Sequence, residues 1–263
     1  MRAGIITGSG SYAWPSLVAA RAATVSTRFG DVEVTEGAVG GVEVVHLARH
    51  GSGHARLSHQ IRHRANVAAL LDRGVDVIIS ATVCGAVDPA AALGSLVVFD
   101  DLHFPSNRLP DGALCSWYDV PGGAGRGHWI FDRPYSPELR GHALAAAREL
   151  DVAVIDHGCY GHVDGPRFNS RSEIGALARL GVTAVSQTAG PEIVLAGEAE
   201  VPLVLLGYLT DYANGVIDEP QPVDVLAANM RASTEVFTRV VDATLARLTA
   251  VPPPVGIVYR FDR

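Results

Sequence analysis

Apolar and polar positions along the chain form short blocks that predict strands and helices in alternation. Mainly apolar runs too short for a helix predict strands at 3–7, 75–82, 96–99, 152–155, 183–185 and 202–209. Apolar residues at helical spacing predict helices at 57–71, 136–150, 171–180, 191–199 and 223–248. This order predicts an α/β protein whose sheet has mainly parallel pairs and gathers the functional loops at its strand ends.

Turn and cap residues mark where several of these elements begin and end. Alternating segments at 31–35 and 42–47, separated by glycines, predict a β-hairpin. Ser-Pro-Glu at 136–138 has the order of a helix start: a capping hydroxyl, a proline in the first turn and an acid near the positive end of the dipole. The proline run at 252–254 ends the last helix.

The segment 100–127 is a long stretch without a predicted element. It holds many Gly, Pro and polar residues, and such a stretch inside a compact domain is usually functional or mobile. Strand-forming segments on both sides fit one sheet, so we do not interpret it as a linker. The 263 residues suffice for a sizeable core, and we expect a single domain spanning 1–263.

Composition narrows the class of protein. The chain is 48% hydrophobic, as in a globular protein, and its net charge of −7 offers no broad basic surface for nucleic acid. All 21 basic residues are arginines, which excludes lysine Schiff-base chemistry and a P-loop lysine.

The cysteines and the lengths of the apolar runs bear on location. Cys84, Cys115 and Cys159 are odd in number and far apart, which is neither a disulfide nor a zinc pattern, and we expect buried, reduced thiols. The chain starts with a strand-like run instead of a signal peptide, and no apolar segment reaches the roughly 18 residues of a membrane helix. We therefore expect a cytoplasmic protein without membrane contact.

Small and basic residues follow several predicted strands and suit an anion. Gly-Ser-Gly-Ser at 8–11 can point backbone N–H groups at an anion, although a plain glycine turn explains it equally well. Arg49 and His50 follow the hairpin in a glycine-rich loop, where they either suit a phosphate or form a solvated pair. Thr82 stands at the end of the next strand.

Another group of side chains suits a flat, polar ligand. Gly-Pro at 165–166 predicts a turn that projects the ring of Phe168 and the amide of Asn169. Asp211 follows a strand and suits a heterocycle, or it is an ordinary turn or cap residue ahead of Asn214. Together with the anion-binding loops, these residues predict a two-part binding site.

Four motifs, in matching order and spacing, give the chain a family resemblance. They are Gly-Pro-Arg-Phe at 165–168, Thr-Ala-Gly-Pro-Glu at 188–192, Arg-His-Gly at 49–51 and Thr-Asp-Tyr at 210–212. From position 4 to about 248 the sequence resembles the trimeric purine nucleoside phosphorylase and methylthioadenosine phosphorylase family. The resemblance implies an α/β, phosphorylase/hydrolase-like fold with a central mixed, partly barrel-like sheet flanked by helices.

The resemblance also implies a reaction and an assembly. A purine nucleoside and inorganic phosphate, its co-substrate, would give free purine and pentose 1-phosphate, with no metal or other cofactor. The assembly would be a homotrimer or a hexamer with sites near subunit interfaces.

Individual roles follow from the same resemblance. Its phosphate-binding positions are Ser9, Arg49, His50, Thr82, Val83 and Thr188. Its base and sugar positions are Phe168, Asn169, Gln187, Asp211, Ala213, His128, Val223 and Leu226. Asp211 is the implied catalytic acid at purine N7, where negative charge develops as the base leaves. Arg49 would direct a fixed positive charge at phosphate. His128 would reach a neighbouring subunit's sugar, although the sequence alone fits a surface histidine equally well.

Some positions depart from the family pattern. Gln187 stands where members usually have methionine under the ribose, so it hydrogen-bonds a sugar hydroxyl or selects a sugar other than ribose. Asp211 resembles adenine-type members, whereas Ala213 stands where those members often carry another acid. Val223 and Leu226 suit a methylthio or other 5′-deoxy group, unless they are core positions of an amphipathic helix.

These features lead to three functional hypotheses. The first is phosphorolysis of 5′-methylthioadenosine or another 5′-modified adenosine, with release of adenine. The second is a 6-oxopurine nucleoside phosphorylase acting on inosine, guanosine or methylthioinosine. The third is a catalytically silent homologue that binds a nucleoside, which Gln187 suggests and the intact phosphate-side residues argue against.

Overall fold

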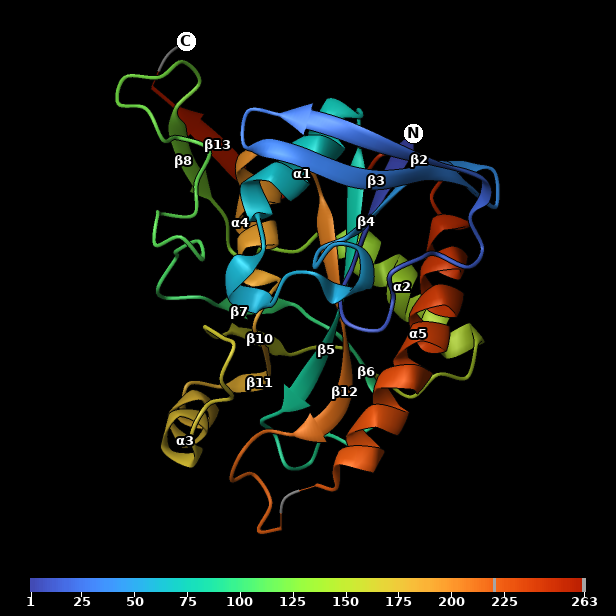
Figure 1. The fold of residues 1–263 in the computed structure, drawn as a ribbon, viewed down its shortest axis with the longest axis vertical. Coiled ribbons are helices and arrows are strands. Elements are labelled where there is room, and N and C mark those ends of the chain that lie inside the picture. Colours follow the sequence, from blue (N-terminus) through green and yellow to red (C-terminus); the bar gives the residue numbers. More distant parts are fainter. Residues whose placement is uncertain (220, 262–263) are drawn as a thin grey trace.

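The protein is built on one large mixed sheet with helices on both of its faces (Figure 1). The computed structural model describes residues 1–219 and 221–261. The helices are α1 (His63–Asp72), α2 (Pro137–Glu149), α3 (Arg171–Arg179), α4 (Gly190–Glu198) and α5 (Val223–Leu245), with 3-10 turns η1 (Ser52–His54) and η2 (Ser58–Gln60). The predicted fold class, a mixed sheet flanked by helices, is confirmed.

The strands fall into a sheet of eleven and a separate pair. The sheet holds β1 (Arg2–Thr7), β2 (Val18–Thr27), β3 (Gly30–Val39), β4 (Val42–Ala48), β5 (Val77–Ala86), β6 (Leu96–Val98), β7 (Asp101–His103), β9 (Val154–Ile155), β10 (Cys159–His162), β11 (Val182–Ser186) and β12 (Leu203–Tyr212). The pair is β8 (Gly127–Ile130) with β13 (Ile257–Arg260).

The sheet branches at β5, the strand on which the rest of the sheet is arranged. The strand order is β2-β3-β4-β1-β5-β11-β10-β7, and β12 also pairs with β5 and leads to β6 and β9. The pairs β4–β1, β1–β5 and β5–β12 are parallel, whereas β5–β11 is antiparallel. Because parallel strands end at the same edge, the loops after β1, β4, β5 and β12 meet there.

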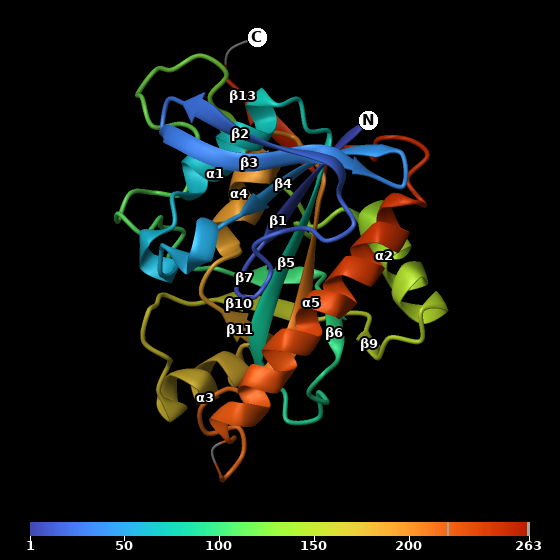
Figure 2. The ribbon, with the colours of Figure 1, turned by 45° about the vertical axis from the view of Figure 1, so that its right-hand side comes forward.

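Two apolar layers hold the helices against the sheet. Successive strand residues point to opposite faces, so Ile6 packs on the side of α1 and α4 while Ile5 packs on the side of α2 and α5. Figure 2 shows α5 running across the second side, where it packs on β12 and β5. The predicted start of α2 is confirmed, because Ser136 Oγ accepts a hydrogen bond from the Leu139 amide at 3.3 Å.

Some boundaries differ from the sequence prediction for physical reasons. The helix expected at 57–71 begins only at His63, because η2 ends at Ile61 in an extended conformation. β5 continues past Thr82 to Ala86, since β11 and β12 both offer backbone partners there. β2, β7, β8, β10 and β13 were not predicted. Among the described helices, none is both long and apolar enough to cross a membrane.

Candidate active site

A cavity of about 280 Å³ opens where the parallel strands end. Most residues predicted for the site line it: Ser9, Arg49, His50, Thr82, Val83, Phe168, Asn169, Gln187, Thr188, Asp211, Ala213 and Leu226. They come from the loops after β1, β4, β10 and β11, from β5, from the end of β12 and from α5. The structure thus brings the phosphate-side and base-side residues into one space.

Of the predicted residues within the described chain, Val223 and His128 lie outside this lining. Val223 is 78% exposed at the first turn of α5, and Leu226, one turn on, is half-buried at the cavity. The idea that both are core positions is therefore wrong, because this turn of α5 projects beyond the part of the sheet it could pack on.

Arg49 is a buried ion-pair partner. Its Nε and Nη2 donate to the two carboxylate oxygens of Glu192 at 2.7 and 3.0 Å, and both side chains are fully buried. Nη2 also donates to Ser80 Oγ at 2.9 Å, and Nη1 donates to the Ala81 carbonyl at 2.8 Å. These bonds use four of the five guanidinium N–H groups. The remaining N–H is on Nη1.

The position of Arg49 Nη1 explains the first glycine of the loop after β1. A Cβ at Gly8 would lie 2.5 Å from Nη1, so only glycine lets the loop approach the guanidinium. Glu192 balances the charge of Arg49 inside the fold, and the role of Arg49 at phosphate stays a prediction. Arg49 offers the cavity one N–H of a neutral pair.

His50 is fixed as a neutral hydrogen-bond acceptor. Its Nδ1 lies 2.8 Å from the Arg56 carbonyl oxygen, which only accepts, so Nδ1 carries the proton and Nε2 is free to accept. Burial, and then the charge of Arg49, lower the pKa of His50 to about 4. The ring of His54 stacks on His50 at 4.0 Å, and the Tyr12 hydroxyl lies 2.9 Å from His54 Nδ1.

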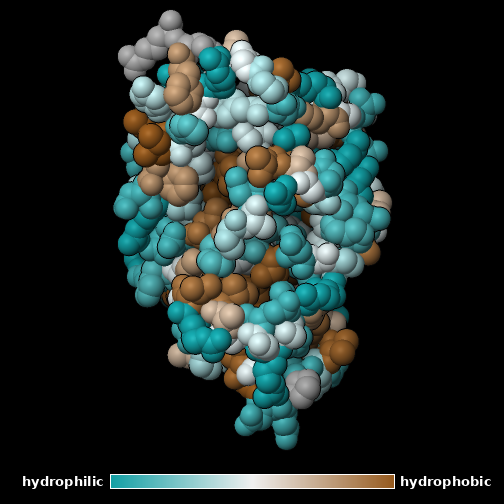
Figure 3. Space-filling model, turned by 90° about the vertical axis from the view of Figure 1, so that its left-hand side faces the viewer, coloured by the Kyte–Doolittle hydropathy of each residue, from teal (hydrophilic) through white to brown (hydrophobic). Residues whose placement is uncertain are grey.

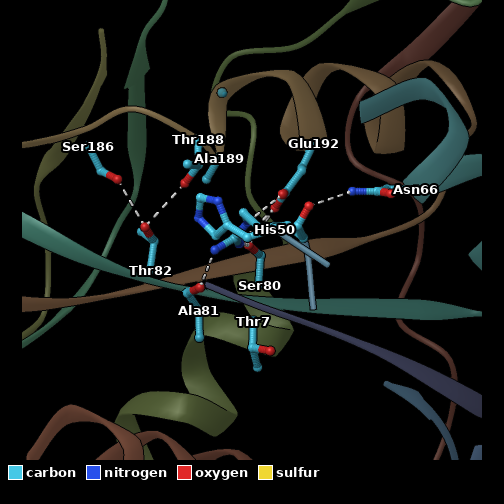
Figure 4. Close-up of polar contacts among 12 residues, drawn as sticks. Thr7, His50, Asn66, Ser80, Ala81, Thr82, Ser186, Thr188, Ala189 and Glu192 are labelled. Carbon is cyan, nitrogen blue, oxygen red and sulfur yellow. Dashed lines mark hydrogen bonds and ion pairs between the residues drawn. The ribbon is translucent and has the colours of Figure 1, made fainter. Parts of the chain in front are cut away.

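A cluster of hydroxyl groups faces the same part of the cavity. Thr82 Oγ1, on β5, lies 3.0 Å from Ser186 Oγ and 3.4 Å from Thr188 Oγ1 (Figure 4). α4 begins at Gly190, two residues after Thr188. Hydroxyl donors beside a helix N-terminus suit the oxygens of an anion.

Asp211 provides the acidic group in the lining that the described residues form. It is partly buried, and burial raises the pKa of its carboxyl while a 2.7 Å hydrogen bond from Thr210 Oγ1 lowers it. Asn229 Nδ2 donates to the Thr210 carbonyl at 2.8 Å and so fixes this end of β12. Phe168, 65% exposed, offers an aromatic face. A planar ligand could meet this face and the Asp211 edge together.

Gln187 already uses both ends of its amide within the protein. Its Oε1 accepts from Ser58 Oγ at 2.8 Å, and its Nε2 donates to the Arg167 carbonyl at 2.9 Å. Neither sugar role expected for Gln187 is visible in these contacts.

Sequence reasoning did not identify several partners of the predicted residues. They are Glu192, Ser186, Ser58, His54 and Asn214. Nor did it identify Tyr12, which contacts His54, or Met230, which lines the cavity. Glu192 gave one signal, since it is an acid in the first turn of a helix whose other residues are almost all apolar. Ser58 gave none, because its partner lies 129 positions away.

His128 lies in another, more open hollow of about 850 Å³. Aromatic and aliphatic side chains around it come from β7, β8, α4 and the segment after β13. Figure 3 shows apolar side chains gathered in a depression on this face. The ring of His128 packs edge-to-face on Phe261 at 5.4 Å.

The side chains expected of a metal site do not converge in the described part of the chain. Across residues 1–219 and 221–261, no group of three or more His, Cys, Asp or Glu is arranged to hold a metal ion. The absence of a metal requirement stays a prediction.

Comparison with known proteins connects the cavity to one family. The family profile described as "Phosphorylase superfamily" matches residues 2–246. A "Probable 6-oxopurine nucleoside phosphorylase" of Thermococcus kodakarensis is 40% identical over 82% of this chain and 80% of its own length. An "S-methyl-5'-thioadenosine phosphorylase" of Mycolicibacterium smegmatis is 36% identical over 82% of this chain and 79% of its own.

A solved structure agrees with these sequence matches. The methylthioadenosine phosphorylase of Schistosoma mansoni, in complex with adenine, superposes with a TM-score of 0.84 and 27% identity. The match covers 94% of this chain and 91% of the other.

Proposed function

Because the chain belongs to the phosphorylase superfamily, we propose which substrate its purine nucleoside phosphorylase activity serves: 5′-methylthioadenosine or another 5′-modified adenosine. The observation that carries this choice is Asp211, a partly buried carboxyl that lines the same cavity as Phe168 and whose pKa is raised by burial. A protonated carboxyl can donate to a purine nitrogen and accept from a 6-amino group with its other oxygen.

The reaction follows from the two halves of the cavity. A phosphate oxygen forms a bond to the anomeric carbon while the bond from that carbon to the purine nitrogen breaks. The bonding electron pair leaves with the purine, and protonated Asp211 donates its proton to the ring as negative charge develops there. Products are free purine and pentose 1-phosphate.

Neutral donors and one acceptor dominate the phosphate half. The hydroxyls of Ser9, Thr82 and Thr188, and one N–H of Arg49, donate to phosphate oxygens. His50 Nε2 accepts from the P–OH of hydrogen phosphate, because the proton of the ring is committed to Arg56. The hydroxyls and N–H groups are therefore left to the unprotonated oxygens.

Apolar side chains support a 5′-modified sugar. Leu226 and Met230 line the cavity from α5, and a methylthio group gains more from apolar contact than a hydroxyl does.

A 6-oxopurine nucleoside is the second candidate. Ala213 is buried and leaves Asp211 without a further acid, and relatives at 40% and 33% identity carry 6-oxopurine nucleoside phosphorylase names.

A panel of methylthioadenosine, adenosine, inosine and methylthioinosine, each with and without phosphate, tests both. Our substrate assignment expects the highest kcat/KM for methylthioadenosine and no base release without phosphate. Faster release from inosine would favour the second candidate, and tight binding without any release would favour a silent homologue.

We also propose that the enzyme is a homotrimer in which His128 completes a neighbouring site. Support comes from apolar side chains exposed around the β8–β13 pair: Leu114, Ile130, Phe131, Ile257, Tyr259 and Phe261. Light scattering should give three chains, with six as the hexamer alternative. Mixing inactive Asp211→Asn with His128→Ala subunits should restore part of the activity, and a monomer would refute the proposal.

A further inference from the structure

The Phe168 loop, residues 164–170, needs help from outside to hold its ring in place. Phe168 is 65% exposed, so its own packing fixes it only weakly. The two residues that flank it, however, each present a backbone carbonyl to a side-chain amide from elsewhere in the chain.

Gln187 holds one side of the loop. Its Nε2 donates to the Arg167 carbonyl at 2.9 Å while its Oε1 accepts from Ser58 Oγ at 2.8 Å. The loop backbone packs directly on this bridge, because a Cβ at Gly165 would lie 2.0 Å from Gln187 Oε1 and 2.2 Å from Ser58 Oγ. Ser58 is itself buried in η2.

Asn214 holds the other side. Its Nδ2 donates to the Asn169 carbonyl at 2.7 Å. Asn214 follows β12 and is three positions after Asp211, and Gln187 follows β11 and is adjacent to Thr188. The strand ends that present the acid and the phosphate-side hydroxyl therefore also grip the loop.

A further anchor of the loop is an exposed ion pair. Glu173 pairs with Arg167 at 2.7 Å and accepts from the Ser170 amide at 2.7 Å, where it caps α3. An ion pair on the surface contributes little to holding geometry. The amide bonds from Gln187 and Asn214 are exposed as well, but both residues line the cavity and bond the carbonyls on either side of Phe168.

We propose that Gln187 and Asn214 are positioning residues that latch the Phe168 loop from both sides and set the distance between the aromatic face and Asp211. In this proposal Gln187 has a structural role and does not contact the sugar. It joins the base-side loop to Ser58, and Ser58 lies two residues after Arg56, whose carbonyl orients His50. The kinetic part of this inference rests on the proposed function, whereas the latch itself does not.

Hydrogen–deuterium exchange on the full-length protein tests the latch without any reaction. Gln187→Met and Asn214→Ala should each speed amide exchange in residues 164–170 by about five-fold to ten-fold, the factor expected for one lost neutral hydrogen bond. Gln187→Glu should behave like Gln187→Met at Arg167, because a carboxylate cannot donate to a carbonyl. The matched control is Gln60→Met, whose amide oxygen bonds the Leu57 amide within η2. Unchanged exchange in the loop would overturn the latch.

Kinetics then separate a latch from a sugar contact. Gln187→Met should raise KM for the nucleoside about five-fold with a smaller change in kcat, and should leave the ribose to 2′-deoxyribose preference unaltered. Ser58→Ala should reproduce part of this effect, and the double variant should be less than additive because both act through one bridge. A changed sugar preference with unchanged loop exchange would overturn the proposal. If wild-type protein released no purine, the proposed function would fail while the exchange result still decided the latch.

Discussion

Asp211 and Glu192 are both carboxylates removed from water, yet their partners give them opposite chemistry. Glu192 accepts two hydrogen bonds from Arg49 and one from Ser80, so its charge is matched inside the fold. Asp211 has one neutral partner, Thr210, and burial raises its pKa. Glu192 therefore stabilises the geometry of the phosphate half, and Asp211 is available to move a proton.

Replacing Asp211 by asparagine tests its role as an acid. Asp211→Asn keeps a donor at the same place but cannot supply a proton, so kcat should fall by about 100-fold, a typical share for general acid catalysis. Wild-type kcat should decline as pH rises through the raised pKa of Asp211, since only the protonated form donates. Stopped-assay rates measured over a series of pH values should show this limb in wild type and lack it in the variant. Near-normal turnover in Asp211→Asn would refute the assignment.

The buried pair of Arg49 and Glu192 gives a further prediction at this scale. Glu192→Gln leaves a buried guanidinium without its counter-charge, and unfolding free energy should drop by about 3–5 kcal/mol. The double variant Arg49→Met, Glu192→Leu should recover most of that stability and still bind phosphate poorly, because the Nη1 N–H is lost. Urea unfolding and the KM for phosphate measure the two effects separately. A double variant with normal phosphate KM would show that Arg49 serves only the fold.

What the sequence predicted among these residues followed from local pattern. Asp211 and Thr188 stand at or just after strand ends, which can be located from short apolar runs, whereas Thr82 lies inside β5. Glu192 lies 143 positions from Arg49, so no local pattern joins them. The residue roles carried by resemblance stay predictions until activity is measured.

At the scale of elements, long strands with a buried face were predicted, whereas exposed strands and the short strand β10 were not. β5 and β12 are buried almost throughout and read as continuous apolar runs. β2 and β13 are mainly exposed, so their residues give no alternation that marks an inner face. Their partners β3 and β8 supply the backbone hydrogen bonds that define them.

α4 and the β8–β13 pair form a close contact that can be tested. A Cβ at Gly197 would lie 2.2 Å from the Trp129 ring, so Gly197→Ala must push β8 away from α4. We expect a loss of about 1–3 kcal/mol in unfolding free energy and a weaker oligomer, since β8 also carries His128. The matched control is Gly141→Ala in α2, where a Cβ meets nothing within 4 Å. That change should stabilise by about 0.5–1 kcal/mol. A Gly197→Ala protein with unchanged stability and assembly, measured by denaturation and light scattering, would contradict the predicted contact.

At the scale of the whole molecule, the branch at β5 brings the phosphate half and the base half to one cavity. β1 and β4 bring the Ser9 and Arg49 loops from one side, and β12 brings Asp211 from the other. β11 enters antiparallel to β5, which is why Thr188 reaches the same cavity from the far branch. The motifs indicated this family and its mixed sheet, but the path of the branch depends on long-range pairing that no single segment encodes.

Several buried histidines make the stability of the fold sensitive to acid. Burial lowers the pKa of His46 and His50 to about 4 and that of His162 to about 3, and it also lowers the pKa of His63. Each of these groups has a folded-state pKa below its unfolded value near 6.5, so the unfolded chain binds protons first as pH falls. Their contribution to stability is present above pH 6.5 and is lost as pH falls toward 4.

We therefore expect unfolding free energy to decrease steeply between pH 6.5 and 4, by up to about 3 kcal/mol for His46 alone. The raised pKa of Asp211 acts in the opposite sense, because the folded state then takes up its proton more readily. His46→Gln removes one titrating group at the bond to Thr7 Oγ1, and its stability should fall less over this interval. Urea unfolding at pH 8, 6 and 4.5, in wild type and variant, measures the difference. Parallel curves for the two proteins would show that His46 titrates alike in both states, and the acid sensitivity would then have to come from other groups.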